Sequence, residues 1–105
     1  MLNEADIKKL VERIVKCVEP DKVIMFGSYA KGIATNKSDL DLFIIKDTPL
    51  PMKQRNEELL PIVNKLLIEV DVHVYTPEEV QEYGSEKYSF VHSVLKTGKV
   101  IYRKI

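Results

Sequence analysis

The sequence lacks the features that mark secreted and membrane proteins. Its only cysteine is Cys17, so no disulfide can form within the chain. No apolar run approaches the ~20 residues that a membrane-spanning helix needs. Residues 1–10 carry acidic side chains and have no long apolar segment of the kind found in signal peptides. We therefore expect a cytoplasmic protein without a disulfide framework, in which Cys17 is a buried thiol on the apolar face of a helix.

An excess of one charge is also missing. The chain has 16 Lys and Arg residues and 16 Asp and Glu residues, so bulk attraction to a nucleic-acid backbone is not expected. Its 105 residues, 45% of them apolar, fit a single domain over residues 1–105. Repeats, low-complexity tracts and linkers are not evident in the sequence.

Hydrophobic periodicity predicts helices in four places. Apolar residues at helical spacing predict a first helix between Asn3, its N-cap, and Pro20. A second helix is predicted over residues 51–67, kinked or divided by Pro61. Thr76 and the Pro and Glu residues after it form a helix start, and a last helix is predicted from Ser85 to a stop at Gly98.

Short apolar runs between these helices predict the strands. They cover residues 22–26, 40–45 and 69–75, and a final short strand is predicted over 100–102. Alternating strands and helices predict an α/β (α+β) fold, with a small mixed β-sheet and helices packed mainly on one face. Such a sheet leaves its other face available for a functional site.

Two acidic residues lie at the start of the otherwise apolar second strand. Side chains two apart on a strand share a face, so Asp39 and Asp41 point the same way while Leu40 and Leu42 point into the core. Neighbouring carboxylates repel each other unless a positive charge lies between them. Mg²⁺ is commonly bound by one or two carboxylates together with phosphate oxygens. This pair therefore predicts a magnesium site.

A Gly-Ser pair follows the first strand and predicts a site for those phosphates. Gly27 lets the backbone approach a ligand closely, and Ser28 adds a hydroxyl group. If the residues after Gly27 open a short helix, its free N–H groups would point at an anion. Lys31 and Lys37 could then lie near a triphosphate, although each is also compatible with a solvated surface lysine.

A third carboxylate is expected from the third strand. Asp71 fits, because it lies on the polar face of a strand whose valines face the core. Glu69 and His73 share that face and are rival candidates. Three carboxylates could hold two metal ions, one to activate an attacking hydroxyl and one to stabilise a leaving pyrophosphate.

These residues together resemble a known signature. Gly27-Ser28, then ten residues, then Asp39-Leu40-Asp41 is similar to the motif of the minimal nucleotidyltransferases in the polymerase-beta-like superfamily. The run from Tyr29 to Gly32, and Ser38 before the acids, also resemble that family. Lys31 departs from it, because many relatives have arginine at this place.

The resemblance implies a fold, a site and an activity. It implies a palm-like core, with phosphates held by Gly27 and Ser28. The nucleotide site would extend to Lys37 and Ser38. Mg²⁺ would be bound by the catalytic residues Asp39, Asp41 and Asp71. The activity implied is transfer of AMP from ATP to a hydroxyl group, acting as an antitoxin on a tyrosine of a small helical HEPN-type partner, with which the chain would assemble.

Two alternatives to that activity stay open. The chain could be a non-catalytic antitoxin or nucleotide-binding module that masks its partner. It could instead transfer the nucleotide to a small hydroxylated molecule, although the sequence offers no extra domain for such an acceptor. Base specificity has no recognisable motif in the sequence.

Overall fold

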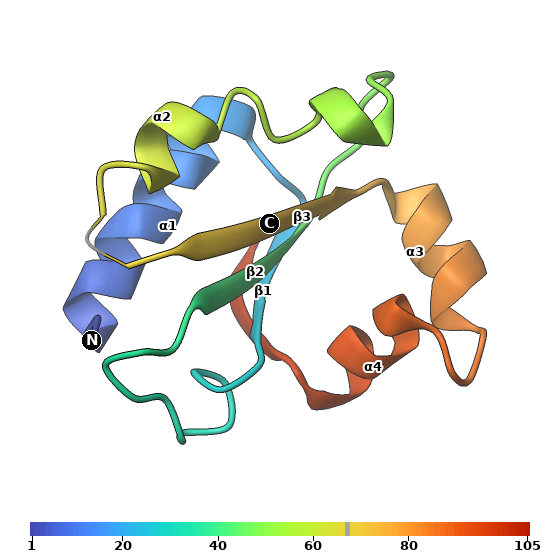
Figure 1. Ribbon diagram of the computed structural model, residues 1–105. Helices are drawn as coiled ribbons and strands as arrows, with labels where there is room; N and C mark the ends of the chain where they lie inside the picture. The colour runs from blue at the N-terminus through green and yellow to red at the C-terminus, as the bar shows by residue number, and fades with distance from the viewer. Residues whose placement is uncertain (67) are drawn as a thin grey trace.

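One mixed sheet organises the computed structural model of the chain, which describes residues 1–66 and 68–105 (Figure 1). The elements follow in the order α1 (Glu4–Val18), β1 (Lys22–Phe26), β2 (Leu40–Ile45), a 3₁₀ turn η1 (Met52–Gln54), α2 (Leu60–Val63), β3 (Val70–Tyr75), α3 (Pro77–Gly84), α4 (Phe90–Thr97) and β4 (Lys99–Arg103). The predicted α+β class and the mixed sheet are confirmed.

The strand order brings three parts of the sequence to one end of the sheet. The order is β3-β2-β1-β4, with β1 antiparallel to β2 and β4, and β2 parallel to β3. The end of β1 therefore meets the start of β2, where Phe26 pairs with Asp41. The start of β3 lies on the other side of β2, where Asp71 pairs with Asp41.

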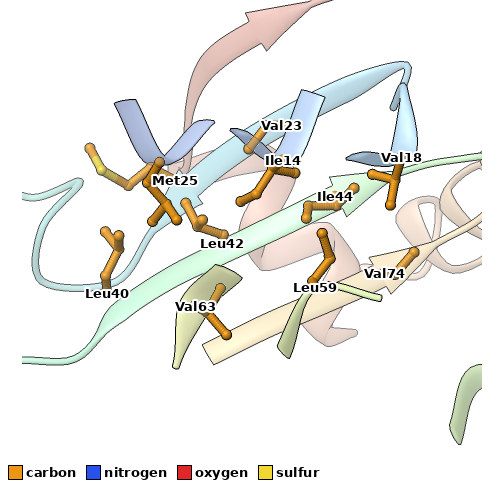
Figure 2. Close-up of a cluster of buried hydrophobic side chains, with 11 residues drawn as sticks. Ile14, Val18, Val23, Met25, Leu40, Leu42, Ile44, Leu59, Val63 and Val74 are labelled. Carbon is orange, nitrogen blue, oxygen red and sulfur yellow. The ribbon is translucent and has the colours of Figure 1, made fainter. Parts of the chain in front are cut away.

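One face of the sheet is covered by α1 and α2. Figure 2 shows apolar side chains of α1, the α2 region and the strands pointing toward one another. Ile14, Leu40, Leu42 and Ile44 are completely buried here, and Leu59 nearly so. This is the core predicted from the alternation of Leu40, Leu42 and Ile44 on β2.

Helices also cover part of the opposite face, which the sequence did not predict. Helices α3 and α4 lie across the sheet from α1 and α2 (Figure 1). A second cluster forms there from Ile24, Phe43, Ile45, Val91 and Val94. The helices are thus divided between two faces, because Phe43 and Ile45 on β2 share the face of Asp41 and must also be shielded from water.

Three predicted helix ends agree with the structure and one does not. Asn3 and Thr76 are N-caps as predicted, each in a capping box with the third residue of its helix, and Gly98 ends α4. The predicted start at Ser85 is wrong: Ser85 ends α3, and Ser89 caps α4 by accepting a 3.0 Å hydrogen bond from the His92 N–H group.

The predicted helix over 51–67 is broken into short pieces. Of residues 51–66, which the structure describes, only η1 and the four-residue α2 are helical, and Pro61 lies in the first turn of α2, where its missing N–H group costs nothing. The last residue of that prediction, Leu67, lies outside the described residues. Cys17 is exposed and not buried, and its thiol donates to the Glu58 carbonyl at 3.7 Å. No helix among residues 1–66 and 68–105 is long and apolar enough to cross a membrane.

Candidate active site

Two carboxylates face each other where β2 and β3 begin. Asp41 and Asp71 are direct partners in the parallel register, and both are half-buried. Asp39 comes immediately before β2 and is exposed. The structure therefore pairs Asp41 closely with Asp71 and leaves Asp39 at the outer rim of the same sheet end.

Gly27 lies directly against the Asp41 carboxylate. Its φ is +74°, a conformation that side-chain-bearing residues rarely adopt. A Cβ atom built on Gly27 would collide with Oδ2 of Asp41. Glycine is needed here both for its positive φ and for the close approach to Asp41. The backbone after β1 packs on the side chain at the start of β2, which gives a physical reason for the spacing between the Gly-Ser pair and the acids.

The residues after Gly27 form a compact turn and not the short helix considered from the sequence. The Lys31 N–H group donates to the Gly27 carbonyl at 3.1 Å, and the Ile33 N–H group donates to the Ser28 carbonyl at 3.1 Å. These bonds close a loop over residues 27–33 beside the carboxylates. Ser28 is half-buried in it, and Lys31 is exposed.

A second turn leads from this loop into the acids. Oγ of Ser38 accepts a 2.8 Å hydrogen bond from the Thr35 N–H group, and Oγ1 of Thr35 accepts one of 3.2 Å from the Lys37 N–H group. Ser38 therefore holds the turn that directs the chain into β2. Lys37 is exposed at the tip of this turn, and a role for either residue in nucleotide binding stays a prediction.

Burial and neighbouring negative charge act together on the Asp41 carboxylate. Burial raises the pKa of Asp41, and repulsion from Asp71 raises it further, with a smaller contribution from Asp39. His73 acts in the opposite direction and lowers the pKa of Asp41. The carboxylates thus lie closer together than their charges favour, as expected where a cation or a proton completes a site.

This donor set fits a divalent cation that also binds phosphate. Within residues 1–66 and 68–105, no three His, Cys, Asp or Glu side chains lie close enough together to hold a metal ion by themselves. Mg²⁺ commonly takes only one or two carboxylates and completes its coordination with water and phosphate oxygens. Asp41 and Asp71 can supply those carboxylates, and Asp39 is near enough to affect the pKa of Asp41.

The rival residues on β3 lie in different surroundings. Glu69 precedes the strand and is exposed. The His73 ring contacts the rings of Phe26 and Phe90, with centroids 5.7 and 5.1 Å away. This aromatic group, Phe26, His73 and Phe90, borders the carboxylates where α4 begins. The alternation of β3 predicted the direction of His73, but the approach of Phe90 depends on how α4 packs, which the sequence did not predict.

Tyr29, for which the sequence pattern indicated no contact, joins the Gly27 loop to the start of the chain. The Tyr29 hydroxyl accepts a 3.1 Å hydrogen bond from the Leu2 N–H group, and its ring packs against the α1 side of the core. The position of Tyr29 next to the Gly-Ser pair was the only signal in the sequence.

The fold and this arrangement define a nucleotidyltransferase. Residues 8–104 match the family described as polymerase beta, nucleotidyltransferase, and the chain belongs to this family. A protein of Methanocaldococcus jannaschii named "Putative protein adenylyltransferase MJ0604" is 34% identical over 83 residues, which is 77% of this chain and 77% of the relative.

Solved structures share the fold. The crystal structure of a "putative nucleotidyltransferase" from Sulfolobus solfataricus superposes with a TM-score of 0.66 at 19% identity, covering 93% of this chain and 78% of the other. A crystal structure described as a toxin–antitoxin with AMP-PNP gives a TM-score of 0.60 at 21% identity, covering 98% of this chain and 75% of the other. At these identities the likeness concerns the fold.

Proposed function

We propose that the chain transfers AMP from ATP to a hydroxyl group of a partner protein in a Mg²⁺-dependent reaction. The observation that carries the proposal is the pair of facing carboxylates, Asp41 and Asp71, with the Gly27 backbone packed against one of them. Phosphoryl transfer needs positioning and charge neutralisation more than covalent participation of the protein, so a site of this size is sufficient.

The residues divide the reaction between them. The Gly27–Ser28 turn would hold the β- and γ-phosphates, and Asp39, Asp41 and Asp71 would hold Mg²⁺. Asp71 accepts the proton of the acceptor hydroxyl. The acceptor oxygen then bonds to the α-phosphorus, and the bond from that phosphorus to the bridging oxygen breaks, releasing pyrophosphate. Bound Mg²⁺ supplies neutralisation of the charge on the phosphate oxygens.

A protein acceptor is supported by the relatives. The Methanocaldococcus protein is named a protein adenylyltransferase, and a chain with the same fold belongs to a toxin–antitoxin bound to AMP-PNP. By the resemblance noted from the sequence, the acceptor is a tyrosine of a small helical HEPN-type toxin, and the modification neutralises it. The resemblance also supports assembly of the two proteins.

The test uses the purified chain, Mg²⁺, α-labelled ATP and the product of the adjacent gene. Intact mass should show an added AMP on that product, and peptide mapping should place it on a tyrosine. The Asp39→Ala/Asp41→Ala double variant should transfer nothing. Tight binding without any transfer by the wild-type chain would contradict the proposal and favour a module that only masks its partner.

A further inference from the structure

Strand β3 has one edge that the sheet does not use. It is the outermost strand on its side, and within the described part of the chain it pairs only with β2 (Figure 1). In this parallel register, the Leu40 N–H group donates to the Glu69 carbonyl at 3.0 Å, and the Lys46 N–H group donates to the Tyr75 carbonyl at 2.9 Å. The odd-numbered residues of β3 thus bond to β2, and the even-numbered ones direct their backbone groups outward.

Only part of this outward edge is covered. Arg55 donates from Nη1 to the Val74 carbonyl at 3.2 Å and closes that end of the strand. Between described residues, no hydrogen bond reaches the outward backbone groups of Val70 and Val72. The outward backbone groups of Val70 and Val72 are therefore available to pair with one short additional strand, which would end where Arg55 covers Val74.

A groove of about 650 Å³ runs along the open part. Its walls come from both faces of β3 and from the α2 region, and they include Asp71, His73, Asn56 and Asn64. The groove therefore joins the free edge of the strand to the carboxylate site. Apart from the buried Val74, the residues of β3 are only partly buried, in contrast to β2, so the strand has room for a neighbour.

We propose that the acceptor protein binds here as an extended segment, paired with the backbone of Val70 and Val72, and that this pairing places its acceptor hydroxyl beside Asp71. The inference rests on the proposed function for the hydroxyl acceptor. The occupant of the groove is an extended peptide segment with a hydroxyl-bearing side chain at its central position.

The pleat of the sheet determines where that side chain goes. Phe26, Asp41 and Asp71 form one row across β1, β2 and β3 on the same face. A residue of an added strand opposite Asp71 would continue this row and point to the same face. Its hydroxyl would then lie next to the carboxylate that accepts the proton.

The direction of approach also suits the reaction. The Gly27 turn lies on the β1 side of Asp41, and β3 lies on the opposite side. In-line displacement requires the acceptor and the leaving pyrophosphate on opposite sides of the α-phosphorus. Phosphates held at Gly27 therefore require an acceptor that arrives from the β3 side, which is where the groove opens.

Amide hydrogen exchange measured by NMR on the full chain gives the first test. In dilute free protein the amides of Val70 and Val72 should exchange about ten-fold or more faster than those of Asp71 and His73, which bond to β2. Slow exchange at Val70 and Val72 would overturn the proposal, because the edge would already be covered. Slowing that depends on protein concentration would identify a second copy of the chain as the occupant.

The second test adds a defined probe in the presence of Mg²⁺ and ATP. The probe is the peptide Lys-Thr-Val-Tyr-Val-Thr-Lys at millimolar concentration, and its matched control carries N-methyl groups on Val, Tyr and Val. The unmodified peptide should slow exchange at the Val70 and Val72 amides by about ten-fold, and the methylated peptide should not. Absence of any effect, or equal effects from both peptides, would overturn edge pairing.

Mass spectrometry of the same samples separates the two proposals. AMP on the unmodified peptide together with protection at Val70 and Val72 supports both. Protection without AMP on the peptide supports edge docking and counts against the hydroxyl transfer to a protein segment. AMP transferred equally to both peptides supports the transfer and overturns the docking mode.

Discussion

The contact between Gly27 and Asp41 can be tested with a matched pair of glycine substitutions. Gly27 and Gly32 have nearly the same φ, +74° and +72°. Alanine at either position carries a left-handed strain of about 1–2 kcal/mol. The surroundings differ, because a Cβ at Gly32 would have no heavy atom within 4 Å, whereas a Cβ at Gly27 would collide with the Asp41 carboxylate.

Gly32→Ala should therefore destabilise the chain by the strain alone, about 1 kcal/mol, and leave AMP transfer near the wild-type rate. Gly27→Ala carries the same strain and must also displace a side chain, at a further cost of about 1–3 kcal/mol if Asp41 stays in place. If Asp41 rotates away instead, the extra cost falls, but the carboxylate leaves its position beside Asp71. Either response should lower transfer, by roughly 100-fold where a metal ligand loses its orientation.

The assays are urea unfolding with Mg²⁺ removed and the initial rate of AMP transfer from labelled ATP. The ratio of the two variants matters more than either value, since the backbone strain is common to both. Equal transfer rates in Gly27→Ala and Gly32→Ala would refute the reasoning, because the carboxylate would then tolerate displacement. Equal stabilities with unequal rates would identify rotation of Asp41 as the response.

Two further predictions concern partly buried carboxylates. Asp41→Asn should stabilise the metal-free chain against urea at neutral pH, because it removes a charge that burial and repulsion disfavour. The same variant should abolish AMP transfer. The control Asp47→Asn, at an exposed site, should change neither the stability nor the transfer. Glu79→Gln should destabilise by about 1–3 kcal/mol at neutral pH. The hydrogen bond with Arg55 lowers the pKa of Glu79 in the folded protein. The stability that Glu79 contributes is therefore fully present above the pKa that Glu79 has in the unfolded chain. It is lost as the pH falls through the lower pKa that Glu79 has in the folded protein. The variant should therefore show a flatter acid limb in unfolding than Glu78→Gln, which changes an exposed side chain of the same helix turn.

Local signals in the sequence were sufficient for the elements that carry the site. The strands over 22–26 and 40–45 form with the predicted bounds, because each is a short apolar run that ends at polar or turn-forming residues. The Thr76 helix start is confirmed because a capping box uses side chains only three residues apart. The prediction of one helix over 51–67 was wrong. The buried apolar residues Leu59 and Val63 pack against the core from short turns as well as they would from a long helix.

The contacts within the site depend on strand order, which local patterns do not contain. The sequence predicted that Asp41 and Asp71 belong to one polar face, and parallel pairing of β2 with β3 makes them neighbours. That Gly27 packs on Asp41, and that Phe90 reaches His73, follows only once β1 and α4 are placed against β2. The spacing of the Gly-Ser pair and the acids indicated the chemistry without indicating these contacts.

Glu79 and Asp41 are partly buried carboxylates that each face a charged neighbour, and they differ in whether that neighbour stabilises their charge. Glu79 is held by Arg55 at 2.6 Å and by the Thr76 N–H group at 2.8 Å, and its pKa is lowered, as in a completed ion pair that fixes α3 to the sheet. Asp41 faces another aspartate, and its pKa is raised. Evolution of a stable core alone would remove such repulsion, which costs stability in the absence of a ligand. The disfavoured charge of Asp41 lies against the Gly27 backbone, so the electrostatic repulsion in this site falls where a bound cation would relieve it.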